Sequence, residues 1–332
     1  MDCKRPYKYR ALKQIGILFC MLLLSSCTWV KDETENCAVG FWLNLHYTYN
    51  ILDVEAAPEY ISEVVVYIYD AEGNYVSRME VQKGLLLANN HRIRVEGLPE
   101  GDYQFVVWSG TADSHYSISG DRSTMDQFRL SLAGAGSNSA DQLPDLYYGS
   151  LKTVHYDNAY ALHDVYLTKN TNQLACLVVP LSSDSTVSPS DFDLKVVSAN
   201  GVMNINNMLV SDDLITYQPF VRQTVTVDDA EYGQLKGIGF NVSTLRLMED
   251  RDCRLILEKK STGEEIFNIS FPEYIGMIGA LYTALGRPLT VQEYLDRQDF
   301  YTIVFFLSGD LNQLIQLQVN SWRLRAKNHL KL

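Results

Sequence analysis

The chain has 332 residues, with 28 Lys and Arg against 40 Asp and Glu. This acidic balance argues against nucleic acid and against an anionic lipid surface as partners, and it mainly supports solubility. The length predicts two domains, because it exceeds what one hydrophobic core usually serves, and the 21 tyrosines favour the half-buried positions of an all-β fold.

An apolar run over residues 15–24 follows a cationic segment and is too short to cross a bilayer as a stable helix. The cationic residues are Lys4, Arg5, Lys8, Arg10 and Lys13. The pattern predicts an export signal over residues 1–26, and its end, Leu24-Ser25-Ser26-Cys27, resembles a bacterial lipobox. We therefore expect cleavage between Ser26 and Cys27 and attachment of a diacylglyceryl group to the Cys27 thiol. An ordinary secretory signal cut elsewhere and an N-terminal membrane anchor are the alternatives.

Removal of the signal leaves 23 Lys and Arg against 39 Asp and Glu, a net charge of −16. With Cys27 lipidated, the free thiols are those of Cys37, Cys176 and Cys253. An oxidising compartment permits one disulfide among them, but an odd count with scattered spacing is no disulfide framework. Cys176 and Cys253 lie in strand-like runs, where cysteine is usually a small buried hydrophobe. We predict no obligatory disulfide, and the pairing of the three thiols stays open.

Residues 27–38 are charged and lack an apolar period, so we expect a lipidated tether. Apolar and polar residues then alternate over residues 39–50, which predicts a half-buried strand and the start of an N-terminal β-sandwich over residues 39–170. Further strands are expected at residues 63–70, 75–81, 91–96, 103–108, 146–156 and 161–168. Turn residues predict a hairpin at residues 70–74 and a strand-turn-strand unit through Pro99 and Gly101. Residues 109–140 are polar and small, and they predict a long loop.

The polar segment 169–172 separates two apolar runs and is the predicted boundary to a C-terminal β-sandwich over residues 171–332. Its strands are expected at residues 173–181, 192–198, 215–220, 238–248, 254–258, 265–270, 301–307 and 311–325. Residues 272–285 and 290–297 lack β alternation, and Pro272 and Thr290 suit helix starts, so a short helical insertion is predicted. Short strands punctuated by turns in both halves favour an all-β fold of two tandem β-sandwiches.

The sequence contains no motif that predicts catalysis, a cofactor or a metal. Phosphate-binding glycine loops and the G-x-S-x-G elbow are missing from the sequence. The six histidines are scattered, and none stands close to another His or Cys; they are His46, His91, His115, His155, His163 and His329. Neighbouring acids could serve as glycosidase carboxylates, but in so acidic a chain they are better read as solvated turn residues; the pairs are Asp212-Asp213, Asp228-Asp229 and Glu249-Asp250. Asp212 and Asp310 could contact calcium, but the spacing of a dedicated loop is missing. We therefore predict a protein that is not an enzyme.

Long alternating strands leave sheet edges with unpaired N–H and C=O groups, which another subunit's strand can cover. The terminal segment 314–324 alternates apolar residues on both faces and could serve its own sheet or that of a neighbour. The simpler expectation is that it pairs within its own domain.

An ordered set of segments resembles one family, the FimB-like fimbrial anchor and minor-subunit lipoproteins of the Bacteroidia. The segments are the lipobox at Cys27, CAVGF at residues 37–41, YTYN at 47–50, VYIYDAEG at 66–73, LPEGDYQFVVW at 98–108, LYYG at 146–149, VQEYLDR at 291–297, FYTIVFFL at 300–307 and VNSWRL at 319–324. Where the family pattern has Pro after the second cysteine, Ala38 stands here. The resemblance implies two transthyretin-like β-sandwiches and a place in a type V pilus at the cell outer membrane, with fimbrial shaft subunits as partners.

In such pili, the resemblance implies that an Arg- or Lys-specific protease removes the lipid and first strand of shaft subunits, whose groove then takes a neighbour's C-terminal strand. Between Cys27 and Arg78 this chain has no arginine, and its one lysine is Lys31, ahead of the fold. We therefore predict an anchor that keeps its lipid and accepts a shaft subunit at a sheet edge of the N-terminal domain. Its own C-terminal strand is expected to pair within its own domain.

Two other functions remain as alternatives to the anchor. A tip or accessory adhesin would use the same export and assembly route and would donate its C-terminal strand. A surface glycan-binding lipoprotein would use aromatic platforms such as Trp42, Trp108 or Tyr147, although aromatic residues in strands mostly belong to the core.

Overall fold

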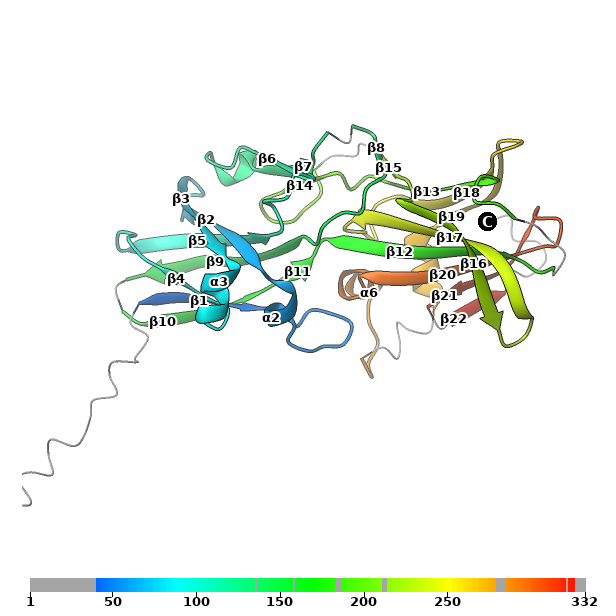
Figure 1. Ribbon diagram of the computed structural model, residues 1–332. Coiled ribbons are helices and arrows are strands. Elements are labelled where there is room, and N and C mark those ends of the chain that lie inside the picture. The colour runs from blue at the N-terminus through cyan, green and yellow to red at the C-terminus, as the bar shows by residue number, and fades with distance from the viewer. Residues whose placement is uncertain are drawn as a thin grey trace, which may run out of the picture. The chain divides into compact units, whose positions relative to one another are not determined.

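A three-stranded and a five-stranded sheet face each other in the first half of the chain (Figure 1). The three-stranded sheet has the order β10 (Ala161–Tyr166), β1 (Phe41–His46) and β4 (Arg92–Val95). The five-stranded sheet has the order β11 (Thr168–Lys169), β9 (Tyr147–Tyr156), β5 (Gly101–Ser109), β2 (Glu63–Asp70) and β3 (Tyr75–Gln82). Every second residue of β1 is buried, and Phe41 and Leu43 share one core with Val66 and Phe105 of the facing sheet. The strand predicted to open the N-terminal domain is therefore confirmed.

This computed structural model describes residues 40–134, 136–157, 159–182, 187–210, 214–278, 285–320 and 322–325, the last four as backbone. The predicted export signal, the tether and the lipid site at Cys27 lie outside these residues, and so does Cys37.

A second, smaller layer covers the other face of the five-stranded sheet. It is a three-stranded sheet of order β14 (Val202–Asn204), β7 (Arg129–Leu132) and β6 (Tyr116–Ser119). Trp108 on β5 is fully buried and stacks on Phe128 at 6.2 Å between ring centroids. Because β2 and β5 are covered on both faces, their apolar runs are nearly continuous, which confirms the prediction of a buried strand over residues 63–70.

The second half of the chain forms another pair of facing sheets. The six-stranded sheet has the order β16 (Val221–Asp229), β17 (Gly233–Leu245), β12 (Thr171–Pro180), β20 (Phe300–Leu307), β21 (Leu314–Val319) and β22 (Trp322–Arg325). The five-stranded sheet has the order β19 (Glu264–Ser270), β18 (Cys253–Lys259), β13 (Phe192–Ser198), β15 (Ile215–Tyr217) and β8 (Asn138–Ser139). Phe267 of β19 stacks on Phe305 of β20 at 4.2 Å between ring centroids, so the two sheets meet in one core.

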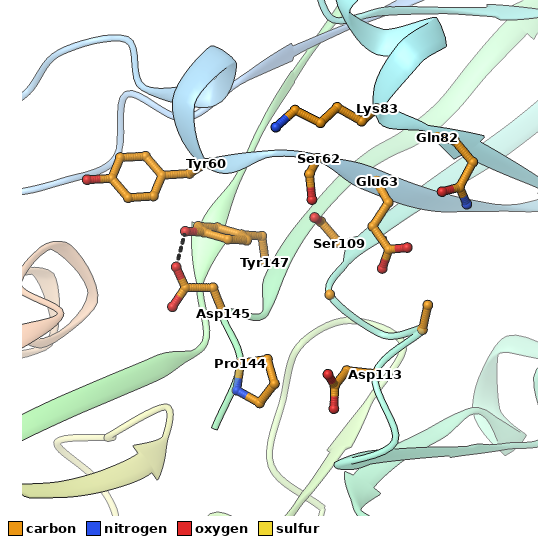
Figure 2. Close-up of a pocket in the computed structure, with 12 residues that line it drawn as sticks. Tyr60, Ser62, Glu63, Gln82, Lys83, Ser109, Asp113, Pro144, Asp145 and Tyr147 are labelled. Carbon is orange, nitrogen blue, oxygen red and sulfur yellow. Dashed lines mark hydrogen bonds between the residues drawn. The ribbon is translucent and has the colours of Figure 1, made fainter. Parts of the chain in front are cut away.

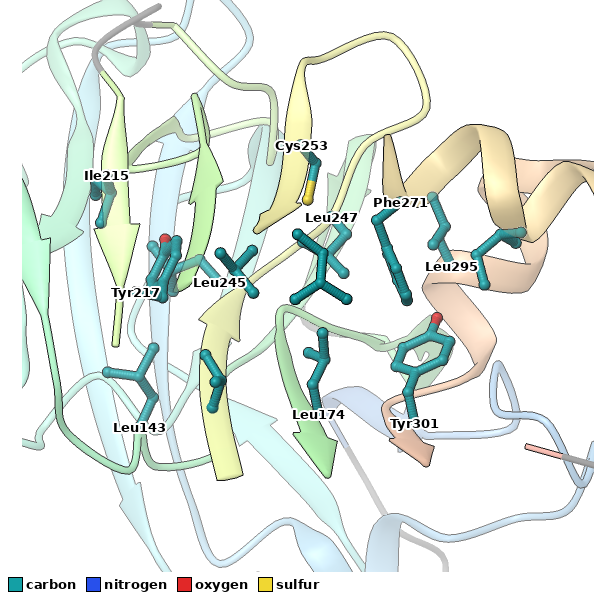
Figure 3. Close-up of a cluster of buried hydrophobic side chains, with 14 of the residues drawn as sticks. Leu143, Leu174, Ile215, Tyr217, Leu245, Leu247, Cys253, Phe271, Leu295 and Tyr301 are labelled. Atoms are coloured by element: carbon teal, nitrogen blue, oxygen red, sulfur yellow. The ribbon is translucent and has the colours of Figure 1, made fainter. Parts of the chain in front are cut away.

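Short helices lie between the strands. Those of the first half are α2 (Ala57–Tyr60), α3 (Lys83–Ala88) and a 3-10 turn at Met125–Gln127. The predicted helical insertion is confirmed as α4 (Phe271–Met277) and α6 (Val291–Arg297). Thr290 caps α6, since its hydroxyl accepts the Glu293 N–H at 3.0 Å. Figure 3 shows Phe271 and Leu295 of these helices beside Tyr301, and the Phe271 and Tyr301 rings meet edge to face at 5.1 Å.

The fold is thus all-β, with tandem sandwiches and a short helical insertion in the second, as predicted. The predicted boundary at residues 170 and 171 remains a prediction. Two strand pairings join residues on either side of it, because β14 pairs with β7 and β15 pairs with β8. The residues from Phe41 onward cluster as one compact unit.

The strands expected at residues 91–96 and 103–108 are confirmed as β4 and β5, but they lie in facing sheets, because β4 pairs with β1 while β5 pairs with β2 and β9. Two expectations from the sequence were wrong, and one long strand was missed. The predicted loop 109–140 contains β6, β7 and β8, whose few apolar residues gave no periodic signal. β16 was missed because its side chains are largely solvated. The long terminal strand is the hairpin of β21 and β22, which turns at Asn320 with φ of 52°, a left-handed conformation that Asn tolerates.

Candidate functional site

Strand β1, which directly follows the predicted tether, lies in the middle of its sheet. It pairs in parallel with β10, Phe41 opposite Ala161, and antiparallel with β4, Phe41 opposite Val95. Its inner residues are fully buried. The groove that loss of a first strand would open is therefore filled by the chain's own strand.

One outer edge of this sheet belongs to β10, which has no second strand partner among the described residues. The Leu167 N–H donates to the His46 carbonyl at 2.7 Å. Because alternate residues of a strand direct their backbone groups to opposite sides, the N–H groups of Leu162, Asp164 and Tyr166 are directed away from β1. This edge can therefore accept an added strand.

The β10 edge is six residues long and exposes two apolar side chains beside one charged residue, Asp164. Leu162 is 38% exposed and Tyr166 is 60% exposed, and Tyr160 lies just before the strand at 55%. The opposite edge of the same sheet, β4, has only four residues and carries Arg92 and Arg94. Short charged edges discourage strand pairing, so β10 is the more receptive edge.

A polar network holds the outer face of the small sheet in place. His46 lies 2.6 Å from the Glu55 carboxylate and 3.0 Å from Asp164, and Asn44 donates to Asp164 at 2.8 Å. Burial alone would lower the pKa of His46, but the two carboxylates more than offset it and raise the pKa above its ordinary value of 6.5. The Tyr166 ring stacks on His46 at 5.2 Å, so the end of the β10 edge is fixed against β1.

The loop after β1 is tied to α6 in the second half of the chain. The Arg297 guanidinium donates to the Asn50 carbonyl at 3.1 Å and to the Asp53 carboxylate at 3.0 Å, and it lies 4.3 Å from the centre of the Tyr49 ring. The Arg297 side chain is only 10% exposed. These contacts fix the C-terminal end of β1, which links the first strand to both halves of the fold.

Two of the acidic residues considered for catalysis or calcium, Glu249 and Asp310, lie in turns as expected. Asp228 and Asp229 instead end strand β16, and Asp229 is buried rather than solvated. The Asp229 carboxylate accepts the N–H groups of Glu231 and Tyr232, and Asp310 accepts the N–H of Asn312. Glu249 accepts the Gln292 N–H at 3.2 Å. Among the described residues, no group of three or more His, Cys, Asp or Glu could hold a metal ion. Asp212, Asp213 and His329 lie outside that part of the chain.

Two of the three proposed glycan platforms were wrong. Trp108 and Tyr147 are 0% and 1% exposed and pack in the core, whereas Trp42 is half-buried beneath the Arg94 guanidinium.

Cys176 and Cys253 are buried and form no disulfide, as expected of cysteines that act as small hydrophobic residues. Burial raises the pKa of both thiols, that of Cys253 to about 12. Within the described part of the chain, no helix is long and apolar enough to span a membrane.

These features define an all-β protein whose described surface offers sheet edges and whose described residues include no cluster that could hold a metal ion. Residues 33–328 match the family of fimbrillin-A associated anchor proteins Mfa1 and Mfa2, and the chain belongs to this family. The family resemblance inferred from the sequence is confirmed.

Individual relatives agree with this assignment. The chain is 22% identical over 317 residues to the minor fimbrium anchoring subunit Mfa2 of Porphyromonas gingivalis, covering 91% of each protein. Two solved structures from Bacteroides thetaiotaomicron are similar. A candidate adhesin is 26% identical with a TM-score of 0.77, and a candidate polysaccharide-binding protein is 28% identical with a TM-score of 0.73. Each comparison covers 87% of this chain and 98% of the other.

Proposed function

We propose that this protein anchors a fimbria to the cell outer membrane through a lipid on Cys27. In this proposal the protein is a non-enzymatic base subunit that keeps its first strand and accepts a shaft subunit by strand addition. The observation that carries the proposal is the position of β1, which is paired on both sides in the middle of its sheet.

The position of β1 bears on whether the lipid is retained. Proteolytic removal of β1 would remove the buried side chains of Phe41, Leu43 and Leu45 from the core. It would also leave the backbone N–H and C=O groups of β10 and β4 that face β1 without partners. The sequence from Cys27 to Phe41 offers Lys31 alone to a protease specific for basic residues. Cleavage at Lys31 would release the lipid while leaving β1 in place, so the proposal requires that Lys31 is not cut.

The sheet edges bear on how a shaft subunit attaches. A filament strand added to β10 would pair with the outward N–H and C=O groups of residues 162, 164 and 166 and cover Leu162 and Tyr166. The chain's own C-terminal hairpin pairs with β20 inside the second half. This arrangement supports an acceptor at the base in preference to a strand donor.

Intact-mass spectrometry of the native membrane-bound protein tests retention of the lipid. We expect a mass that corresponds to residues 27–332 plus a diacylglyceryl group and further acylation. A native protein that begins after Lys31 and carries no fatty acid contradicts the anchor. Deleting the gene should release fimbriae into the medium or leave them loosely attached, whereas intact, attached fimbriae with lost adhesion would indicate a tip subunit.

Substitutions at Leu162 test the attachment edge. Leu162→Pro removes one outward N–H from β10 without touching the ladder to β1, and we expect fimbriae to detach from the cells. The matched control Leu162→Thr keeps the N–H and a strand-forming side chain, so fimbriae should stay attached. If the threonine variant loses fimbriae as fully as the proline variant, or if both keep them, backbone pairing at β10 is not the mechanism.

A further inference from the structure

A polar cavity opens in the N-terminal sandwich, and no residue of β10 lines it. It measures about 580 Å³, within the range of ~300–1,000 Å³ typical of small-molecule sites. Its lining comes from α2, the start of β2, the end of β3, the start of α3, the end of β5 with the loop after it, and the start of β9 with the loop before it. Figure 2 shows Tyr60 and Asp145 on one side and Glu63 on the other, with Ser109 between them.

The wall of the cavity is rigid on the Asp145 side. The Tyr147 hydroxyl donates to the Asp145 carboxylate at 3.0 Å, and the Lys169 ammonium lies 2.8 Å from it. Gly110 has φ of +88°, and a Cβ at this position would lie 2.0 Å from the Asp145 carbonyl oxygen. The backbone therefore closes this end of the cavity in a way that only glycine permits.

Ser109 is 3% exposed and lines the cavity at the end of β5. Its backbone pairs with that of Tyr147, and Figure 2 shows its hydroxyl between Tyr147 and Glu63. A hydroxyl in this position can donate a hydrogen bond to a ligand or accept one from it. Glu63 and Lys83 also line the cavity and take part in no ion pair within the described chain.

The charges and hydrogen-bonding groups restrict the ligand. Of the three carboxylates in the lining, Asp145 already pairs with Lys169, and Asp113 lies 2.6 Å from the His115 ring. Glu63 and Lys83 are the charged groups left for a ligand, and one charge of each sign favours neither an anion nor a cation. Lys83 and Ser109 donate hydrogen bonds, and an ammonium ligand has no acceptor to offer them. A sugar hydroxyl both donates and accepts, so it satisfies the two kinds of group together.

The aromatic ring at the mouth fits the same ligand. Tyr60 is 51% exposed, and its inner edge contacts the Tyr47 ring at 6.0 Å between centroids, so the ring is held while one part stays open. An exposed aromatic face packs against the C–H face of a pyranose. We propose that this cavity is a binding site for a neutral saccharide, with Glu63 and Ser109 as its hydrogen-bonding residues and Tyr60 as its apolar wall.

Saturation-transfer NMR on the purified full-length chain tests the site. The probes are methyl glycosides of neutral hexoses and N-acetylhexosamines and their disaccharides, with sialic acid and Nα-acetyl-lysine methylamide as charged comparisons. We expect transfer to at least one neutral saccharide and to neither charged probe. Transfer to the lysine probe alone, or to no saccharide, overturns the proposal.

Variants then place the binding in this cavity. Glu63→Gln and Ser109→Ala should each weaken the affinity for that saccharide about tenfold, since the first replaces a charged acceptor with a weaker neutral one and the second removes a hydroxyl. The exposed Tyr60→Ala, which leaves the core intact, should also weaken it. Glu72→Gln, in a turn outside the cavity, is the matched control and should leave the affinity unchanged. Unchanged affinity in the Glu63→Gln and Ser109→Ala double variant overturns the proposal. Fimbrial attachment tests the proposed anchor function separately, because no residue of β10 lines the cavity.

Discussion

The ion pair between Arg246 and Asp296 gives the sharpest stability prediction. Arg246 follows β17, and its Nε and Nη2 atoms each donate to one Asp296 oxygen of α6 at 2.7 Å. A third nitrogen donates to the Asn207 carbonyl at 3.2 Å. The two side chains are 14% and 6% exposed, so little water reaches the pair.

Replacement of Arg246 by Met leaves the buried Asp296 carboxylate with one remaining side-chain donor, the Gln292 amide at 2.9 Å. Removing one partner of a buried pair costs about 3–5 kcal/mol, because the other charge stays desolvated without compensation. A typical unfolding free energy is ~5–15 kcal/mol, so the variant should be markedly destabilised. Arg246→Met combined with Asp296→Leu removes both charges and should recover most of the loss.

Urea unfolding followed by tryptophan fluorescence measures these changes, since Trp108 is fully buried. Arg287→Met is the matched control, because Arg287 pairs with Glu293 while its side chain is 50% exposed. We expect this control to lose much less stability than Arg246→Met, because solvent screens an exposed ion pair. Equal losses for the two arginine variants would refute the claim that burial makes the Arg246 pair costly to break.

Three further predictions follow from local contacts. Burial lowers the pKa of His46, but its two carboxylate neighbours outweigh burial and raise the pKa of the folded state above 6.5. His46 therefore contributes its full stabilisation below pH 6.5, and this stabilisation is lost as the pH rises through the pKa of the folded state. The unfolding free energy of the His46→Gln variant should not show this pH dependence. Gly97→Ala should cost roughly 1–2 kcal/mol for its positive φ alone, and Gly110→Ala should cost more, because its Cβ would meet backbone at 2.0 Å; thermal melts rank the two. Cys176 and Cys253 should resist iodoacetamide in the native protein and react after unfolding, as peptide mass mapping would show.

The sequence predicts strands well where one face is buried. Alternation in β1 and the continuous apolar runs of β2 and β5 report the burial of each strand directly. The strands β6, β7 and β8 were missed, because a two- to four-residue strand contributes too few apolar positions to establish a period. The existence of the longer strands with a buried face was therefore readable, but short strands and sheet membership were not.

The candidate edge and the cavity could not be predicted from the sequence. β10 is an edge only because β1 pairs with it about 120 positions away, and no local pattern encodes such a partner. The cavity brings Tyr60, Lys83 and Asp145 together from segments far apart in the chain. The anchor family was recognisable because its motifs are local runs, and each can be read without knowing what it packs against.

The central position of β1 also sets an order of events during folding. Asn44 of β1 bonds to Asp164 of β10, 120 residues later, so the first strand cannot complete its sheet until that part of the chain has been synthesised. Closure of the sheet then buries Phe41, Leu43 and Leu45 and pairs β1 on both sides, which removes the strand from proteolytic attack.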